Sequence, residues 1–187
     1  MMQLERVGEA HRLLMLDWRN RPEIARWMYT DHQITAAEHD AWFDRIVASS
    51  AHVYWVISWQ TEPVGVVHLI GEPHGHRAEW GIYVAADKAR GTGAAAGAAF
   101  LSLDHAFRRI GVGRVTCEAL AGNTRALALY QRVGFRREGY LRAHVVRRSE
   151  VFDVVTMAML SDEWTTLRPG LLASLVGRGV LSPEVQS

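Results

Sequence analysis

The stretch Arg90-Gly91-Thr92-Gly93-Ala94-Ala95 stands between an expected strand, Ala78 to Val84, and an expected helix, about Ala94 to Ile110. Glycines let backbone amides approach an anion closely, and the first amides of a helix lack partners and carry partial positive charge. Lys88 and Arg90 add formal charge beside the turn. The stretch predicts a phosphate-binding turn, although a glycine-rich turn between strand and helix often serves only to reverse the chain.

Two familiar phosphate loops do not fit this stretch. A Walker loop needs Gly-Lys-Ser/Thr at the helix start, and this turn has no such lysine. A Rossmann turn needs a parallel βαβ unit and an acidic residue about 20 positions later. The strand before this turn belongs instead to an expected antiparallel meander, and no acidic strand end follows at that spacing.

The residues before the stretch predict two helices and then the meander. Thr35 and Glu38 have the spacing of a capping box, which marks a helix start. The expected elements are a strand at Gln3 to Val7, a helix at Ala10 to Trp18 with Leu13, Leu14 and Leu16 inward, a helix after Thr35 carrying Trp42, Phe43, Ile46 and Val47, a hairpin of His52 to Trp59 and Val64 to Ile70, and a turn at Pro73 to His76.

The residues after the stretch predict an alternation of helices and strands. The first helix has an inward stripe of Phe100, Leu103, Phe107 and Ile110. Next come a strand at Arg114 to Leu120, a helix at Thr124 to Val133 closed by Gly134, and strands at Phe135 to Gly139 and Val151 to Leu160. From Arg168 onward, prolines and glycines are expected to interrupt any long element, with one short amphipathic turn at Leu171 to Val176. We therefore expect one domain at residues 1–167 and a partly flexible extension at 168–187.

Composition limits the class of protein. The 187 residues fit a single domain, and a net charge of +1 gives no basic field for nucleic acid. The single cysteine, Cys117, excludes an internal disulfide and a cysteine-based zinc cluster. The longest apolar run, Ala94 to Leu101, is far shorter than the roughly 18–20 residues that span a bilayer. With no signal-peptide pattern at the N-terminus, we expect a cytoplasmic protein that does not enter membranes.

The order of elements resembles the GNAT family of acyltransferases, whose phosphate turn has the pattern Gln/Arg-x-x-Gly-x-Gly/Ala. A second signature is Asn123, Tyr130 and Gly134-Phe135 at this family's spacing. The resemblance covers roughly residues 3–160. It implies an α/β fold with a central mixed, mostly antiparallel twisted sheet of six to seven strands flanked by about four helices. It also implies acetyl-CoA as cosubstrate and no metal.

The resemblance further implies roles for individual residues. The turn would hold the pyrophosphate, the strand at Trp80 to Val84 would pair with the pantetheine arm, Asn123 would contact that arm, and Tyr130 would protonate the leaving sulfur. The implied cofactor-binding set is Ile82, Tyr83, Val84, Lys88, Arg90, Gly91, Thr92, Gly93, Ala94, Ala95, Asn123 and Tyr130.

Amine acetylation also needs a group that takes a proton from the amine. Glu118 is our first choice, because it lies five residues before Asn123 and matches a glutamate in the sugar-nucleotide branch of the family. Glu79 and His68 are the other candidates. Cys117 is expected to be a small buried residue rather than an acyl carrier, so we expect direct transfer.

The N-terminal region bears on the acceptor. Arg19, Asn20, Met28 and His39 resemble the family branch that acetylates the 4-amino group of a UDP-linked amino sugar, the acetyltransferase step of pseudaminic acid biosynthesis. With His68, they form the expected substrate-binding set. The alternatives are a protein N-terminus, as in ribosomal-protein acetyltransferases, another small amine, or a non-catalytic acyl-CoA-binding protein. Nothing in the sequence sets the oligomeric state, and a homodimer is one expectation.

Overall fold

The computed structural model describes residues 1–30, 32–71 and 75–186. Its centre is a seven-stranded sheet in the order β1-β2-β3-β4-β5-β7-β6. The strands are β1 (Met2–Arg6), β2 (His52–Trp59), β3 (Glu62–Gly71), β4 (Arg77–Val84), β5 (Arg114–Leu120), β6 (Arg136–Arg147) and β7 (Glu150–Leu160). Neighbouring strands are antiparallel except β4 and β5, which are parallel. The expected fold class is confirmed.

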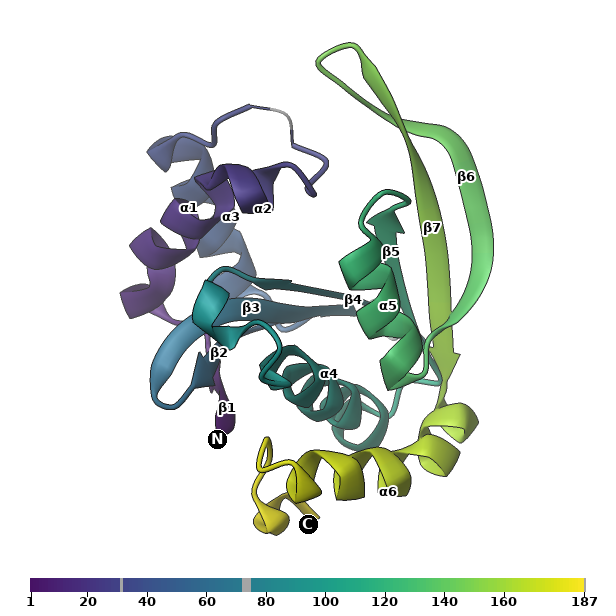
Figure 1. The fold of residues 1–187 in the computed structure, drawn as a ribbon. Helices are drawn as coiled ribbons and strands as arrows, with labels where there is room; N and C mark the ends of the chain where they lie inside the picture. Colours follow the sequence, from purple (N-terminus) through teal and green to yellow (C-terminus); the bar gives the residue numbers. More distant parts are fainter. Residues whose placement is uncertain (31, 72–74, 187) are drawn as a thin grey trace.

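Helices cover both faces of the sheet (Figure 1). They are α1 (Arg12–Asn20), α2 (Pro22–Ala25), α3 (Ala36–Ala48), α4 (Ala94–Asp104), α5 (Thr124–Val133) and α6 (Ser161–Gly177), so the described chain has more helices than the four expected. The first three helices enclose one cluster of buried residues against β2 to β4. α4 and α6 enclose a larger cluster on the opposite face. None of the helices in the described residues is long and apolar enough to cross a membrane.

An ion pair joins α1 to α3, and a capping box stabilises the start of α3. The Arg12 guanidinium of α1 pairs with Asp44 of α3 at 2.6 Å, and the predicted capping box joins Thr35 and Glu38 at the start of α3. Met15 and Trp18 form the buried face of α1, so the prediction that Leu13 points inward is wrong: Leu13 is 75% exposed. The Arg12 contacts turn the face that carries Leu13 toward solvent.

α4 is followed by a wider turn. Residues His105–Ile110 form a π-helix, in which the Gly111 amide donates to the Ala106 carbonyl. Each wide turn holds more residues than an α-turn, which rotates later side chains out of the original stripe. Phe100, Leu103 and Phe107 are buried as predicted, whereas Ile110 is 49% exposed.

The C-terminal half of the chain departs most from expectation. β6 extends to Arg147, far beyond the predicted Gly139, and two register shifts against β7 break its alternation. The predicted interruption near Pro169 is wrong, because α6 continues through it, and the expected domain boundary at 167/168 falls inside this helix. Its first half is held by Trp164, which packs on Phe100 of α4 with ring centroids 5.3 Å apart.

The end of the chain returns to the start. After α6, Val180 is fully buried and its carbonyl accepts a hydrogen bond from the Met2 amide at 3.0 Å. A side chain at Gly97 of α4 would meet both Met2 and Val180. The segment after α6 therefore packs against the first turns of α4. The turn predicted at Pro73 to His76 lies partly outside the described residues.

Candidate active site

A cavity of about 1250 Å³ opens where β4 and β5 part. The parallel pairing ends at Glu79 opposite Thr116, and beyond that point the two strands diverge (Figure 1). The β4 edge facing β5 therefore has free backbone groups from Trp80 to Val84. Along β4, Glu79, Gly81 and Tyr83 share the face toward α1 to α3, while Trp80, Ile82 and Val84 share the other. The cavity extends over both sides of this opening.

One end of the cavity is the glycine turn before α4. Gly91 and Gly93 have φ of 77° and 92°, a conformation that glycine adopts without strain, and Gly93 is the N-cap of the helix. The Ala94 amide donates a hydrogen bond to the Thr92 hydroxyl at 3.2 Å. The next amides, of Ala95 and Ala96, precede the first bond of the helix, and both residues lie on the cavity wall. The turn thus offers amide donors to an anion.

The second helix of the cavity, α5, begins at Asn123. Its side-chain oxygen accepts from the Ala126 amide at 3.2 Å, so Asn123 caps the helix while its amide nitrogen keeps two protons for another acceptor. Further along the helix, Tyr130 lies 4% exposed with its ring edge against Trp80, centroids 5.3 Å apart. Among the described residues, Tyr130 Oη has no hydrogen-bond partner. Burial, and then the neighbouring Cys117 and Tyr29, raise the pKa of this phenol.

Two carboxyl groups lie on the wall where the strands part. Burial, followed by the charge of Glu118, raises the pKa of Glu79 above its usual range. Glu118 accepts a hydrogen bond from Tyr29 Oη at 2.6 Å. Tyr29 comes from the segment between α2 and α3. Its pKa is raised first by burial and then by these two carboxylates. The three side chains therefore form one cluster that can attract a cationic amine and take its proton.

Arg19 also lies on the cavity wall, among aromatic rings. Its guanidinium is largely buried, which lowers its pKa, while interaction with Tyr83 and Tyr54 acts in the opposite direction. Tyr54 stacks on His68 with centroids 4.9 Å apart, and His68 lies over Gly81. Burial lowers the pKa of His68 to about 4, which keeps its ring neutral near pH 7. No carboxylate pairs with Arg19 in the described part of the chain.

Other buried donors near Arg19 also lack partners. Within the described residues, Tyr83 Oη and both ring nitrogens of His39 are buried and make no hydrogen bond. His39 is 2% exposed and lies against Trp42 and Phe43. Buried polar groups without partners are rare in folded proteins, and here several of them are gathered on one cavity. All of these residues lie on the cavity wall except Phe43.

The cavity brings together most of the predicted site residues. The predicted residues on its wall are Arg19, Met28, His39, His68, Glu79, Ile82, Tyr83, Val84, Arg90, Gly91, Gly93, Ala95, Glu118, Asn123 and Tyr130. Asn20, Lys88, Thr92 and Ala94 lie off the wall.

The residues off the wall have contacts within the protein. Asn20 bonds the backbone of Ile34 through both its amide atoms, at 2.8 and 2.9 Å, and so fixes the chain that leads into α3. Lys88 pairs with Glu62 of β3. Thr92 donates to the Ala89 carbonyl at 2.8 Å and so braces the turn from within.

Sequence reasoning missed four contributors. Tyr29 and Trp27 lie in a segment without helical or strand periodicity, where a run of large apolar residues was the available signal. Tyr54 sits in a strand and reads as an ordinary core position. Arg178 belongs to the tail expected to be partly flexible, yet it lies on the cavity wall, with its Nη2 3.6 Å from the point where a Cβ on Gly93 would stand.

Residues 2–136 match the family model described as "Acetyltransferase (GNAT) domain". The chain belongs to the GNAT acetyltransferase family. The match includes both the turn at Arg90 to Ala95 and the Asn123–Tyr130 helix. This acetyltransferase therefore uses acetyl-CoA as its cosubstrate to acetylate an amine. Among the described residues, no group of three or more histidine, cysteine or acidic side chains could hold a metal ion.

Solved structures share the fold of this acetyltransferase. It superposes on spermidine N-acetyltransferase from Vibrio cholerae, in complex with CoA and spermine, with a TM-score of 0.80 and 21% identity over 88% of this chain and 98% of the other. It also superposes on a candidate acetyltransferase from T. thermophilus, with a TM-score of 0.76 and 26% identity over 93% of each chain. No curated protein matches it in sequence.

Proposed function

We propose that this acetyltransferase transfers acetyl directly to the primary amine of a small acceptor that also carries an anionic group. Our specific candidate is the 4-amino group of a UDP-linked amino sugar. The observation that carries the proposal is Arg19: a guanidinium on the cavity wall without a carboxylate partner in the described residues, in the same cavity as Glu79 and Glu118.

The argument from Arg19 concerns the cost of burying a charge. A buried charge without a partner costs several kcal/mol, and the protein recovers part of that cost when a ligand supplies the opposite charge. A guanidinium binds phosphate through paired hydrogen bonds. The unpartnered Tyr83 hydroxyl beside it offers another donor. A diphosphate satisfies this set of donors, whereas a polyamine brings only further positive charge.

Of the two carboxylates in the acceptor site, Glu79 fits the general base better than Glu118. A base works best when its pKa approaches the working pH, and the raised pKa of Glu79 moves in that direction. Glu118 already accepts a hydrogen bond from the Tyr29 hydroxyl, which occupies one of its oxygens and holds the carboxylate in place. We therefore assign proton removal to Glu79 and attraction of the ammonium group to Glu118. His68, whose pKa is lowered to about 4, is a weak base.

Acetyl-CoA, when bound, supplies the acetyl thioester. The Ala95 and Ala96 amides would hold its pyrophosphate, with Arg90 and Arg178 nearby, and Asn123 Nδ2 would donate to the pantetheine arm. Tyr130 Oη, which has no partner in the described chain, would donate its proton to the departing sulfur. Cys117 is buried, and burial raises the pKa of its thiol, so it stays protonated and supports direct transfer over an acyl-cysteine route.

A thiol-release assay with two acceptors tests the proposal. We expect CoA thiol with a UDP-linked 4-amino sugar, and a raised melting temperature with UDP alone, since a ligand at 100 times its Kd stabilises by about 2.7 kcal/mol. Arg19→Met should raise the KM of the UDP acceptor at least tenfold. Arg45→Met, on the exposed side of α3, is the matched control.

Spermidine is the competing acceptor, because four carboxylates (Glu23, Glu38, Glu79 and Glu118) lie on the cavity wall. Turnover of spermidine with no protection by millimolar UDP, and no effect of Arg19→Met, would refute the anionic acceptor. Release of CoA thiol with basic peptides alone would favour a protein N-terminus as the acceptor. No release with any amine would favour a non-catalytic binder. A cytoplasmic location and a homodimer stay predictions.

A further inference from the structure

We propose that Arg147 is a positioning residue for the acceptor site. From the β6–β7 hairpin, it holds the segment Arg26 to Thr30 across the cavity and so keeps Tyr29 against Glu118. Every residue of this segment lies on the cavity wall. The inference rests on acetylation of an amine but not on the identity of the acceptor, so it stands whether a sugar nucleotide or a polyamine is the substrate.

The Arg147 guanidinium binds three backbone carbonyls. Its Nη1 donates to the Met28 carbonyl at 2.5 Å and to the Ala25 carbonyl at 3.3 Å, and its Nη2 donates to the Arg26 carbonyl at 3.0 Å. Ala25 is the last residue of α2, and Arg26 and Met28 follow it; the Ala25 carbonyl also accepts the Met28 amide at 3.0 Å, so Arg147 adds to a turn that the backbone has begun to close. A planar guanidinium can reach several acceptors at once, which an ammonium group cannot do with the same geometry.

Packing fixes the guanidinium in this position. It lies over the ring of Phe152, 4.4 Å from the ring centroid. Phe152 packs with Trp27 on a small buried cluster of Leu120, Val145 and Val154. Trp27 therefore joins the segment after α2 to the hairpin through apolar contact, while Arg147 joins it through hydrogen bonds. Arg147 and Met28, which share one of these bonds, lie 119 positions apart in sequence.

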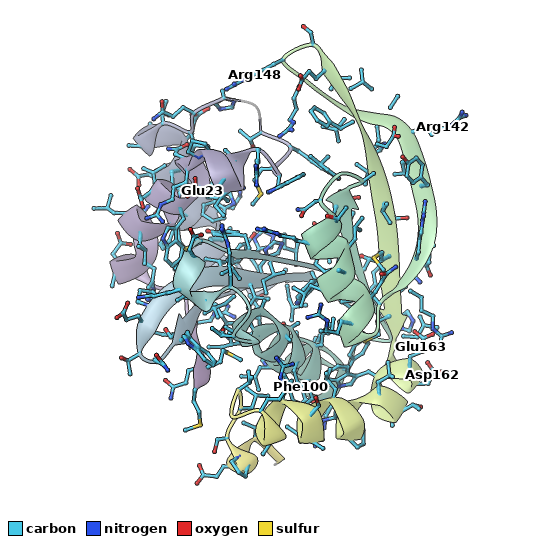
Figure 2. The ribbon with its side chains drawn as sticks, viewed as in Figure 1. Glu23, Phe100, Arg142, Arg148, Asp162 and Glu163 are labelled. Carbon is cyan, nitrogen blue, oxygen red and sulfur yellow. The ribbon has the colours of Figure 1, made fainter. Side chains whose placement is uncertain are left out.

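The hairpin is long enough to make this contact because β6 and β7 extend past β5. Figure 1 shows their tip arching toward the loop after α2. In Figure 2, Arg148 at the tip lies on the side facing α2, whereas Arg142 points away from the outer edge of β6. The hairpin thus has one side turned to the acceptor site and one turned to solvent, which provides a matched control on the same element.

The segment held by Arg147 carries the Tyr29 hydroxyl to Glu118. Without the hydrogen bonds from Arg147, water would solvate the three carbonyls and the segment would move away from the cavity. The acceptor site would then lose one wall, and Glu118 would lose the hydrogen bond that orients it. The cofactor end of the cavity is built by the glycine turn and by Asn123, and within the described residues no hydrogen bond or ion pair joins either of them to this segment. Loss of Arg147 should therefore weaken acceptor binding and leave CoA binding intact.

The first test compares Arg147→Met with Arg142→Met. Acceptor kinetics use a UDP-linked 4-amino sugar and spermidine as probes, and calorimetry measures the Kd of CoA. For Arg147→Met we expect about a tenfold rise in the acceptor KM, an unchanged Kd for CoA, and faster amide hydrogen exchange at residues 26–30 but not at 94–104. Arg142→Met should match the wild type. Equal effects of the two variants, or unchanged amide hydrogen exchange at residues 26–30, would overturn the proposal. The exchange measurement needs no acceptor, so it tests the proposal independently of the substrate's identity.

The second test asks whether Arg147 acts through Tyr29. Tyr29→Phe removes the hydrogen bond to Glu118, so a double-mutant cycle with Arg147→Met should be non-additive in acceptor kcat/KM, with the second change costing little after the first. Additive losses would contradict a shared role. Arg147→Lys distinguishes a loss of positioning from a loss of folding, because lysine retains the positive charge and the aliphatic part of the side chain but lacks the planar guanidinium. It should retain the wild-type melting temperature while showing most of the KM rise.

Discussion

The Tyr29 hydroxyl donates to a Glu118 oxygen at 2.6 Å, although the two residues lie 89 positions apart in sequence. This bond bears on the choice between two carboxylates, of which the sequence favours Glu118 as the base. Glu118 is held in one orientation by the hydrogen bond from the phenol. Glu79, on the neighbouring strand, keeps part of its side chain exposed, and partial burial followed by the charge of Glu118 raises its pKa. These differences favour Glu118 as the group held in place and Glu79 as the group suited to take up a proton.

Glu79→Gln should therefore lower kcat by about 100-fold, the lower range for loss of a general base. Glu118→Gln should act mainly on the acceptor KM. The wild-type kcat/KM should fall on the acidic side with a pKa above the usual glutamate value of about 4.3. Steady-state pH profiles of both variants check this. A larger kcat loss in Glu118→Gln than in Glu79→Gln would reverse the assignment.

The same substitution should change stability with pH. Because the folded-state pKa of Glu79 is raised, the folded protein binds this proton more tightly than the unfolded chain, and stability is lost as the pH rises through that folded-state pKa. Glu79→Gln cannot ionise, so we expect it to melt above the wild type at pH 7–8. The difference should vanish at about pH 4 and below, where Glu79 is protonated in both states. A lower melting temperature at pH 8 would contradict the burial argument.

Tyr130→Phe removes a hydroxyl that has no partner in the described chain and should leave the ring packing on Trp80 intact. We expect kcat to fall by about 100-fold or more, the usual scale for loss of a general acid, with the Kd of CoA within about twofold. Cys117→Ser is the control, since the thiol is buried and protonated. Full activity of Tyr130→Phe, or loss of turnover with Cys117→Ser alone, would contradict direct transfer with Tyr130 as acid.

Arg178 is expected to contribute to binding of the CoA pyrophosphate, because it lies beside Gly93 at the start of α4. Arg178→Ala should weaken CoA binding at least about tenfold by calorimetry, because a hydrogen bond to a charged group contributes about 1.5–3 kcal/mol. The loss should persist with 3′-dephospho-CoA. Arg109→Ala, after α4, is the control. If Arg178→Ala weakened the binding of CoA but not of 3′-dephospho-CoA, Arg178 would contact the 3′-phosphate rather than the pyrophosphate.

Much of this site was predictable because short local signals define it. β5 and α5 begin and end at the predicted residues, since strand alternation, the Asn123 cap and the Gly134 C-cap are all encoded within a few positions. The glycine turn follows from the same kind of signal, whereas Asn123, Tyr130 and Glu118 were singled out by the resemblance to the family. They lie together on one cavity wall because the β4–β5 pairing stops at Glu79.

What escaped prediction depends on contacts between distant segments. Proline at 169 signals a break, but Arg168 pairs with Asp104 of α4 at 2.6 Å and Trp164 packs on the same helix, and these contacts outweigh the local cost. Two register shifts in β6 hid its length, because they interrupt the period that identifies a strand. Tyr29, Arg147 and Arg178 act from a loop, a hairpin and a tail, where no periodic pattern marks a role.

The docked tail makes a separate prediction about stability. A methyl at Gly97 would stand 2.7 Å from Met2 Cε and 2.9 Å from Val180 Cγ1, so Gly97→Ala overpacks the junction of β1, α4 and the segment after α6. We expect a loss of about 1–2 kcal/mol in the free energy of unfolding. At Gly170 of α6 nothing lies within 4 Å of an added Cβ, so Gly170→Ala should gain about 0.5–1 kcal/mol through helix propensity. Urea unfolding measures both, and stabilisation by Gly97→Ala would mean that the tail does not pack on α4 in solution.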